Sequence, residues 1–457
     1  MMNSTNTCSM PLSRLATIIG SDFSGEDTVF TGVSTDTRTV KQGELFFAIN
    51  GENFDAHDYL QQAADSGAVA AVVSKTGSDS LPLLAVEDTV HALGQLAQAC
   101  RMQFSFPVVG ITGSNGKTTV KEMIASILQV SGEPLVTIGN LNNDIGVPLT
   151  LLRSDESYTH AVIEMGANHI GEIAYLTKLA RPQVGVVTNA LSAHLEGFGS
   201  RDGVALAKGE LFDALQENNV AIINADDSYC GQWQLRAQPA SIVTFGLNNS
   251  ANVTARDVSF DPASWQTTFT IISDQGMQDI AMPLVGRHNV MNALAAAAAA
   301  LALGISLQEV AEGLQQMSAV GGRLHAAKTA RGSLVIDDSY NANPDSLQAG
   351  LDVLAMLPGK RILVLGDMAE LGEAASSLHA DIAASARQAN VQYLYAVGEL
   401  SAATVQQFGN GGQHFENKES LLRALNDIMD ENSVALVKGS RRMQMDSIVK
   451  ALLGETK

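Results

Sequence analysis

The sequence is poor in cysteines, aromatic side chains and positive charge. Of its 457 residues 3 are cysteines, 5% are aromatic, and 28 basic residues face 48 acidic ones. Cys8, Cys100 and Cys230 are odd in number and scattered, which is not the pattern of a disulfide framework and favours a reducing cytoplasm. The net charge of −20 repels polyanions, so we expect no nucleic-acid partner.

Long hydrophobic runs are also missing. The longest nearly apolar stretch, residues 293–303, ends at Gly304. A membrane-spanning helix needs about twenty such residues. The chain opens without the charged, apolar and small-residue segments of a signal peptide. We therefore expect a cytoplasmic protein without a membrane span, acting as a monomer on small molecules.

Hydrophobic residues make up 46% of the chain, enough to fill the cores of about three domains. Short strand-like runs alternate with longer segments of helical pattern, which predicts an α/β fold with mainly parallel sheets. The predicted strands are 68–73, 108–112, 161–165, 184–188, 220–223, 334–336 and 361–365. Boundaries near residues 101–106 and 322–332 predict three domains, 1–103, 104–325 and 326–457.

The strongest local signal is a Gly-rich turn between an apolar strand and a helix. Its glycines allow backbone amides to approach phosphate oxygens, Lys117 adds a positive charge, and Thr118 or Thr119 can reach magnesium. Ile111 stands where the usual phosphate loop has its first glycine. The residues expected to hold ATP here are Gly113, Ser114, Asn115, Gly116, Lys117, Thr118 and Thr119.

A phosphate loop alone suits a kinase, a nucleotide switch or a ligase. A guanine-type switch needs an Asn-Lys-x-Asp base reader, and the nearest segment, residues 417–420, lacks the final Asp. This absence disfavours the switch.

Polar residues follow the next predicted strands. Glu164 ends one strand and is a candidate magnesium ligand, because carboxyl ends of parallel strands face the nucleotide crevice. Asn189 and His194 follow the next strand, and Lys208 lies in an Ala-Lys-Gly-Glu segment. Each alone has an ordinary structural reading: an acid at a strand end, a solvated histidine, a surface lysine.

Amides and cations in the last third add candidates. Asn289 and Asn292 share a helix face and could read a base or ribose, although Asn289 could equally cap its helix. Asn343 followed by Pro344 predicts a helix start. Lys438 and Arg441 follow a late strand and could bind a carboxylate. The remaining polar side chains of this part, Asp338, Tyr340, Asn341 and Ser346, indicate ligand contact.

Taken together, these residues resemble the Mur ligases of peptidoglycan synthesis. The resemblance rests on residues 113–118, Glu164, His194, residues 207–210 and Asn289 with Asn292. The segments 34–38, 51–58, 139–148, 338–344 and 438–441 extend it over almost the whole chain. Ala56 stands where glycine is more usual, which concerns local backbone geometry only.

The resemblance implies an N-terminal domain for a UDP-linked precursor, a central ATPase domain and a C-terminal Rossmann-like domain. It implies that Lys117, Glu164, His194 and Lys208 serve catalysis, with Thr118 and Glu164 on one Mg²⁺ and His194 and a carbamylated Lys208 on a second. Asn289, Asn292, Arg323 and Asp338 would approach ATP. Ser34, Asp36, Arg38 and Asn142 would approach the precursor.

The implied reaction adds D-alanyl-D-alanine to a UDP-muramoyl tripeptide through an acyl phosphate. Its acceptor site would use Tyr340, Asn341, Asn343, Ser346, Lys438 and Arg441. A small-molecule kinase would leave phosphate on its acceptor, and a nucleotide-gated scaffold would show negligible acceptor-dependent turnover. A folate-tailing ligase shares the ATPase core but has no equivalent of the N-terminal hundred residues. Whether the third precursor residue is diaminopimelate or lysine stays open.

Overall fold

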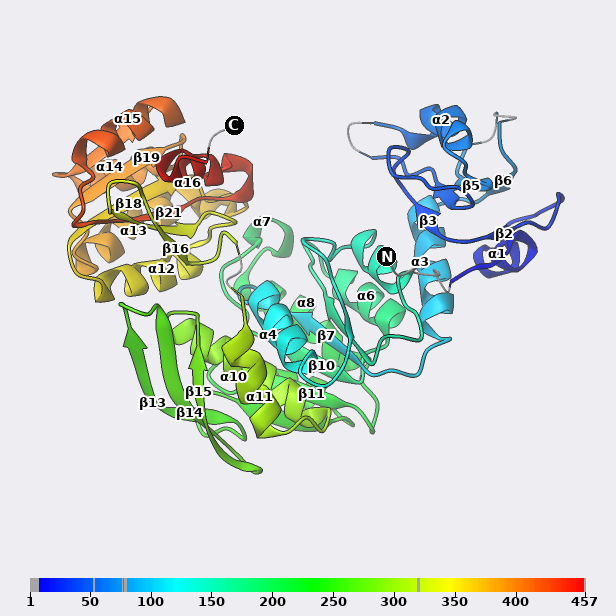
Figure 1. Ribbon diagram of the computed structural model, residues 1–457, viewed down its shortest axis with the longest axis horizontal. Helices are drawn as coiled ribbons and strands as arrows, with labels where there is room; N and C mark the ends of the chain where they lie inside the picture. The colour runs from blue at the N-terminus through cyan, green and yellow to red at the C-terminus, as the bar shows by residue number, and fades with distance from the viewer. Residues whose placement is uncertain (1–7, 52–53, 76, 78–79, 319–320, 456–457) are drawn as a thin grey trace.

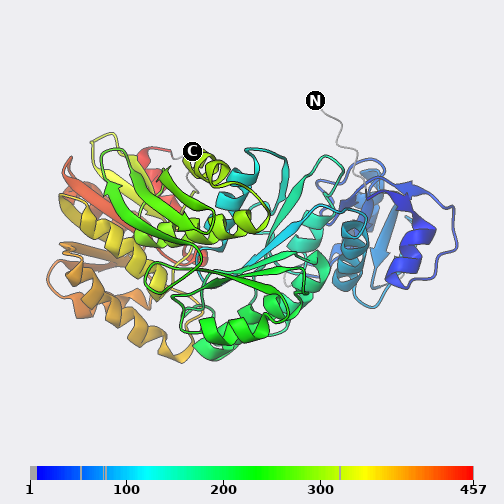
Figure 2. The same ribbon diagram turned by 90° about the horizontal axis from the view of Figure 1, so that it is seen from below.

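The computed structural model describes residues 8–51, 54–75, 77, 80–318 and 321–455. The chain forms three α/β regions, with the N-terminal and C-terminal sheets at opposite ends and the central sheet between them (Figures 1 and 2). This confirms the predicted fold class. Each predicted strand segment overlaps an observed strand, and their ends differ by no more than two residues.

The N-terminal region holds a small parallel sheet in the order β3-β4-β5-β6 and a short antiparallel pair, β1 with β2. Its strands are β1 (Met10–Pro11), β2 (Val29–Phe30), β3 (Val33–Ser34), β4 (Leu45–Phe47), β5 (Ala70–Val73) and β6 (Leu83–Ala85). Its helices are α1 (Leu12–Ile19), the short 3-10 turn η1 (Ala56–Tyr59), α2 (Leu60–Asp65) and α3 (Thr89–Arg101). Glu52 and Asn53 of the segment 51–58 lie outside the described residues.

The central region is a parallel six-stranded sheet in the order β12-β11-β10-β7-β9-β8, followed by the antiparallel sheet β13-β14-β15. The strands are β7 (Val108–Thr112), β8 (Pro134–Val136), β9 (His160–Glu164), β10 (Val184–Val187), β11 (Val220–Asn224), β12 (Ser241–Phe245), β13 (Thr254–Asp261), β14 (Gln266–Ser273) and β15 (Gly276–Met282). The helices are α4 (Lys117–Leu128), α5 (Gly146–Leu151), α6 (Glu172–Ala180), α7 (Leu195–Phe198), α8 (Arg201–Asp213), α9 (Cys230–Arg236), α10 (Arg287–Ala302) and α11 (Leu307–Gln316).

The C-terminal region is a second six-stranded sheet in the order β16-β17-β21-β18-β19-β20, parallel except for β16. The strands are β16 (His325–Lys328), β17 (Leu334–Asp338), β18 (Lys360–Gly366), β19 (Tyr393–Val397), β20 (Gly412–Phe415) and β21 (Ser433–Lys438). The helical elements are α12 (Pro344–Met356), η2 (Gly372–Ala374), α13 (Ala375–Gln388), α14 (Ser401–Phe408), α15 (Lys418–Ile428), η3 (Arg441–Met443) and α16 (Asp446–Leu453). The predicted boundary after residue 325 would cut β16 behind its first residue, and both boundary positions stay predictions.

Helix α3 connects the N-terminal and central regions and is apolar on both sides. It packs against α1 of the first region and against α5 and α6 of the second. Leu93 and Leu96 are fully buried in one hydrophobic cluster that also contains Leu15 and Leu176. The two regions therefore share a continuous core.

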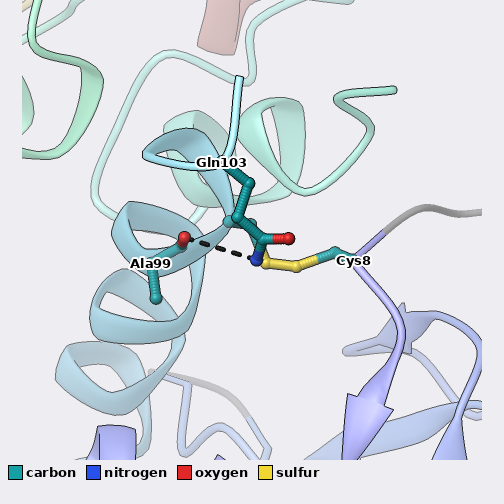
Figure 3. The surroundings of a disulfide bond; sticks show 4 residues. Cys8, Ala99 and Gln103 are labelled. Carbon is teal, nitrogen blue, oxygen red and sulfur yellow. Dashed lines mark hydrogen bonds between the residues drawn. A yellow bond between two sulfur atoms is a disulfide. The ribbon is translucent and has the colours of Figure 1, made fainter. Parts of the chain in front are cut away.

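Cys8 and Cys100 form a disulfide between the start of the described chain and the end of α3. Their Cα atoms lie 5.6 Å apart, although the residues are 92 positions apart in the sequence. Figure 3 shows this pair beside the last turn of the helix, where Nε2 of Gln103 donates a hydrogen bond to the carbonyl of Ala99. The number and spacing of the three cysteines did not indicate this pair, and Cys230 is free.

Helices of the described residues are all too short or too polar to cross a bilayer.

Candidate functional site

A cavity of about 1330 Å³ lies where the carboxyl ends of the central strands face the C-terminal region. The phosphate loop, the loops after β9 and β10 and the start of α10 line one side, and residues 338–346 and 438–442 line the other. The start of α3 reaches its rim. Sites at the carboxyl ends of parallel strands are the usual place for ligands in such sheets.

Two glycines give the phosphate loop its path. Gly113 has φ 146° and Gly116 has φ 84°, conformations that L-residues rarely adopt. A Cβ atom on Gly113 would meet Oγ1 of Thr188 at 1.9 Å, and one on Gly116 would meet Oδ1 of Asn292 at 2.4 Å. These positions require glycine both for conformation and for space.

Lys117 begins α4 directly after this turn. Its Nζ donates hydrogen bonds to the carbonyls of Gly113 at 2.7 Å and Ser114 at 3.0 Å. Burial lowers the pKa of Lys117 to about 8, while Glu164 opposes that shift and Arg323 adds to it. The loop thus holds the Lys117 amine inside the cavity. Phosphate oxygens could take the place of the two backbone carbonyls as its partners.

Glu164 is the last residue of β9 and is 2% exposed. Its Oε1 accepts a hydrogen bond from Nδ2 of Asn142 at 2.8 Å, whereas its buried Oε2 has no partner. A buried carboxylate oxygen without a partner is rare and indicates a missing ligand. Within the described part of the chain no three His, Cys, Asp or Glu side chains form a metal-holding group. The unpartnered oxygen of Glu164 fits Mg²⁺, which needs few protein carboxylates besides phosphate and water.

His194 lies in the loop between β10 and α7 and lines the cavity. Its Nδ1 lies in direct contact with Oε2 of Glu370 from the C-terminal region. The contact is not an aligned hydrogen bond. Close contact with the His194 ring holds the pKa of Glu370 below its ordinary value, against a smaller effect of burial.

Lys208 lies on α8 just behind the cavity wall and is 1% exposed. Its Nζ donates a hydrogen bond to the carbonyl of Ala167 at 3.3 Å and lies 4.8 Å from the ring centre of Phe198. Burial, and next the nearby charge of Lys117, lower the pKa of Lys208 to about 7. The surface-lysine reading is wrong, because this amine is enclosed.

The expected nucleotide residues from α10 onward line the same cavity. Nδ2 of Asn289 donates to the carbonyl of Val285 at 2.8 Å, and Nδ2 of Asn292 donates to Oδ1 of Asn289 at 3.0 Å. Asn289 therefore does not cap its helix, which begins after Gly286. Nη2 of Arg323 donates to Oγ1 of Thr118 at 3.1 Å.

Residues expected at the acceptor site also line the cavity, but several are engaged within the protein. Lys438 is 2% exposed and pairs with the carboxylate of Asp338. Burial raises the pKa of Asp338, and Lys438 opposes that shift. Asn343 caps α12 with Ser346 in a capping box, and Pro344 follows, as predicted.

Tyr340, Asn341 and Arg441 line the cavity as well. The guanidinium groups of Arg323 and Arg441 lie 4.6 and 5.5 Å from the ring centre of Tyr340. Arg441 is exposed, so its charge is available to an anionic ligand.

Asn115 links the phosphate loop to the C-terminal region. It forms a reciprocal amide pair with Asn343, with hydrogen bonds of 3.2 and 2.8 Å. Nearby, the amide of Ser192 donates to Oδ2 of Asp345 at 3.0 Å.

Four residues expected at a precursor site do not lie together. Ser34, Asp36 and Arg38 form a local cluster after β3, in which Arg38 makes a bidentate pair with Asp36. These three do not line the cavity, whereas Asn142 does and contacts Glu164. Hydrogen bonds from Arg38 lower the pKa of Asp36 to about 2.

The sequence reading missed part of the cavity rim and the partner of His194. Asp88, Asp144, Glu172 and Tyr175 meet at this rim; the last two lie on α6, and the other two lie just before α3 and just before α5. Burial raises the pKa of Asp144, and Glu172 and Asp88 raise it further. No local motif marks such residues, because their proximity comes from packing α3 against α5 and α6.

The comparisons with known proteins agree along the chain. Residues 29–101 match the family described as "Mur ligase family, catalytic domain", residues 111–300 match "Mur ligase middle domain", and residues 322–441 match "Mur ligase, glutamate ligase domain". UDP-N-acetylmuramoyl-tripeptide--D-alanyl-D-alanine ligase of Escherichia coli is 45% identical over 97% of this chain and 98% of its own.

Solved structures give the same result. A crystal structure of MurF from Acinetobacter baumannii superposes with a TM-score of 0.92 at 34% identity, covering 97% of this chain and 99% of that one. MurF of Thermotoga maritima in complex with ADP gives a TM-score of 0.83 at 26% identity, covering 93% of this chain and 97% of that one. The resemblance predicted from the motifs is therefore confirmed, and the chain belongs to the Mur ligase family.

Proposed function

We propose that this Mur ligase joins D-alanyl-D-alanine to UDP-N-acetylmuramoyl-tripeptide in an ATP-dependent reaction. Its similarity to relatives bearing that name supports the assignment. The observation that carries it is the shared cavity, in which a phosphate loop faces cationic and amide groups of a second sheet. Such a cavity can hold a nucleotide beside an acceptor, as an amide-forming reaction requires.

The residues act in sequence on the bound substrates. The precursor's terminal carboxylate attacks the γ-phosphoryl group of ATP, forming an acyl phosphate and releasing ADP. Lys117 and the loop amides offset the negative charge that develops on the transferring group. The acceptor amine then attacks the acyl carbon, the tetrahedral intermediate collapses, and inorganic phosphate leaves as the amide forms.

Asn289, Asn292, Arg323 and Asp338 contribute to nucleotide binding in this scheme. Ser34, Asp36, Arg38 and Asn142 serve the precursor. Because Ser34, Asp36 and Arg38 lie away from the cavity that Asn142 lines, a long UDP-linked substrate would have to extend between the two places. Tyr340, Asn341, Asn343, Ser346, Lys438 and Arg441 form the acceptor side, with the exposed Arg441 facing the dipeptide carboxylate and the buried Lys438 holding Asp338 in place.

Thr118 and Glu164 would hold one Mg²⁺, and His194 with Lys208 a second. When bound, Mg²⁺ offsets phosphate charge and orients the transferring group. The unpartnered Oε2 of Glu164 supports the first position.

Lys208 serves the second position as a carbamate. The neutral amine attacks carbon dioxide, a nitrogen–carbon bond forms and one proton leaves, so that the neutral amine becomes an anionic carbamate. The enclosed amine, which donates to the backbone carbonyl of Ala167, supports this modification. A buried ammonium would instead repel a metal ion.

The chain acts as a cytoplasmic monomer in this proposal. A reducing compartment would open the Cys8–Cys100 bridge. Thiol alkylation in intact cells followed by mass spectrometry should find both cysteines modified, and sedimentation of the purified chain should give a single species of 48.1 kDa. A protected pair in cells would place the protein in an oxidising compartment.

Product analysis tests the reaction. Purified protein, ATP, D-alanyl-D-alanine and UDP-muramoyl tripeptides carrying diaminopimelate or lysine should yield ADP, free phosphate and a new amide in equal amounts. The two tripeptides also reveal which third residue is preferred. ADP with a phosphorylated acceptor would identify a kinase, and tight ATP binding without acceptor-dependent turnover would identify a binding protein.

A further inference from the structure

Two loops from different sheets meet beside the cavity at His194 and Glu370. His194 follows β10 of the central sheet, and Glu370 follows β18 of the C-terminal sheet. Nδ1 of His194 pairs with Oε2 of Glu370, and the amide of Glu196 donates to the carbonyl of Glu370 at 3.4 Å. The two loops are thus joined through both side chain and backbone.

Both partners have an unfavourable backbone conformation. His194 has φ 54° and Glu370 has φ 63°, in the left-handed region that residues other than glycine rarely occupy. Such conformations have an energetic cost and persist where the surroundings require them, often at functional sites. Here they bring an imidazole and a carboxylate together across the boundary between two regions.

We propose that Glu370 is a positioning residue that orients the His194 ring for metal binding. This inference rests on the proposed role of His194 as a Mg²⁺ ligand. A metal-binding histidine commonly presents its other ring nitrogen to a carboxylate, which fixes the ring orientation. Glu370 faces Nδ1, so Nε2 is the nitrogen left for the metal.

The position of Glu370 gives this contact a second consequence. Its carboxylate comes from the sheet that carries the acceptor side, whereas His194 belongs to the ATPase sheet. The ring is therefore held only when the two sheets are in the arrangement described here. Metal binding at His194 and docking of the C-terminal region consequently support one another.

The test measures metal binding directly. Mn²⁺ binding to the full-length protein with saturating ADP can be followed by the electron paramagnetic resonance signal of free Mn²⁺. Glu370→Ala should weaken Mn²⁺ binding about 10-fold, the lower end of the range for removing such an orienting partner. Glu370→Gln, which keeps the shape and an acceptor oxygen, should weaken it less. Metal-free ADP affinity should stay unchanged.

Glu373→Gln is the matched control, because Glu373 is an exposed acid three positions further on in η2. It should bind Mn²⁺ as the unaltered protein does. The double variant His194→Ala/Glu370→Ala separates positioning from direct ligation. If Glu370 acts through His194, the double variant binds Mn²⁺ no more weakly than His194→Ala alone.

Three results would overturn the inference. Unchanged Mn²⁺ binding by Glu370→Ala, with binding lost in His194→Ala, would leave the proposed function intact and remove only the role of Glu370. Additive losses in the double variant would make Glu370 a ligand in its own right. Unchanged binding by His194→Ala would remove the metal role of His194 and this inference with it.

Discussion

The central region is joined to its two neighbours in different ways. Toward the N-terminus, Leu93 and Leu96 of α3 belong to one apolar core shared by both regions. Toward the C-terminus, the contacts around the cavity are polar, as in the Asn115–Asn343 pair. Apolar contact there comes from Val285, Phe260 and Trp265, which pack with the C-terminal core.

This difference has a mechanical meaning. Separating the N-terminal region from the central region would expose apolar surface to water, at a free-energy cost of roughly 25 cal/mol for each Å². Separating the polar pairs exchanges protein hydrogen bonds for hydrogen bonds to water, which changes the free energy little. The N-terminal region should therefore stay fixed on the central region. The C-terminal region should move toward and away from the central region around the substrates.

The largest effect is expected at Lys208, which lies on α8 of the central region. Lys208→Ala should lower phosphate release about 10²- to 10³-fold, the range for losing one group that stabilises transition-state charge. Short carboxylic acids should restore part of the activity, because they place an anion in the vacated space. Rescue by amines alone would point to a cationic lysine.

The pH dependence of the unaltered protein provides a second measurement on Lys208. Its pKa of about 7 means that the amine becomes protonated as the pH falls through 7, and a protonated amine cannot add carbon dioxide. Activity in carbon dioxide-depleted buffer should therefore recover on adding bicarbonate at pH 8 and much less at pH 6. Equal recovery at both values would contradict the carbamate.

The apolar contact between the N-terminal and central regions can be disrupted at Leu96. Leu96→Ala removes a fully buried side chain and should lower the free energy of unfolding by about 2–5 kcal/mol. Calorimetry should show the N-terminal and central regions losing stability together. Leu235→Ala is the control: that side chain is 79% exposed, so the change should stay within about 0.5 kcal/mol. Independent melting of the two regions would refute a shared core.

The contact between the central and C-terminal regions can be weakened at Asn343 without removing the cap of α12. Asn343→Asp keeps the oxygen that accepts from Ser346 but loses the amide that donates to Asn115. We expect a loss of about 0.5–1.5 kcal/mol, the usual contribution of one hydrogen bond, seen as a higher Michaelis constant for the acceptor. Asn417→Asp, at the equivalent cap of α15, should leave turnover unchanged.

The smallest effect is expected at residues 34–38, which we propose to serve the precursor. Arg38→Ala should return the pKa of Asp36 from about 2 toward 3.8, as an NMR titration would show. The stability from this pair is present above the unfolded pKa and is lost as the pH falls toward 2. Because the Arg38 side chain is 82% exposed, solvent screens the pair and stability at pH 7 should hardly change. A large loss would mean that the loop supports the domain.

The sequence predicted those features that depend on local pattern. The strand into Gly113 and Gly116, the acid ending β9 and the Asn343–Pro344 helix start all follow from neighbouring residues, and the structure has them in place. The role of Asn289 could not be predicted, because an asparagine near the start of a helix can either cap the helix or point its amide toward a ligand, and both have the same sequence spacing.

What depends on distant packing could not be predicted. Glu370 meets His194 only because two separate sheets face each other, and burial of Lys208 behind the cavity wall is not visible in its neighbours. The separation of Asn142 from Ser34 has the same origin. Polar side chains that meet across domains leave no periodicity in the chain.

The bridge between Cys8 and Cys100 turns most of the N-terminal region into a closed covalent ring. A protease cut at any single bond inside that ring would leave both pieces attached to the rest of the molecule. On a gel without reductant the nicked protein would migrate as one species, and with reductant the fragment would separate. While the bridge is intact, the N-terminal region can therefore be cut without being lost from the molecule.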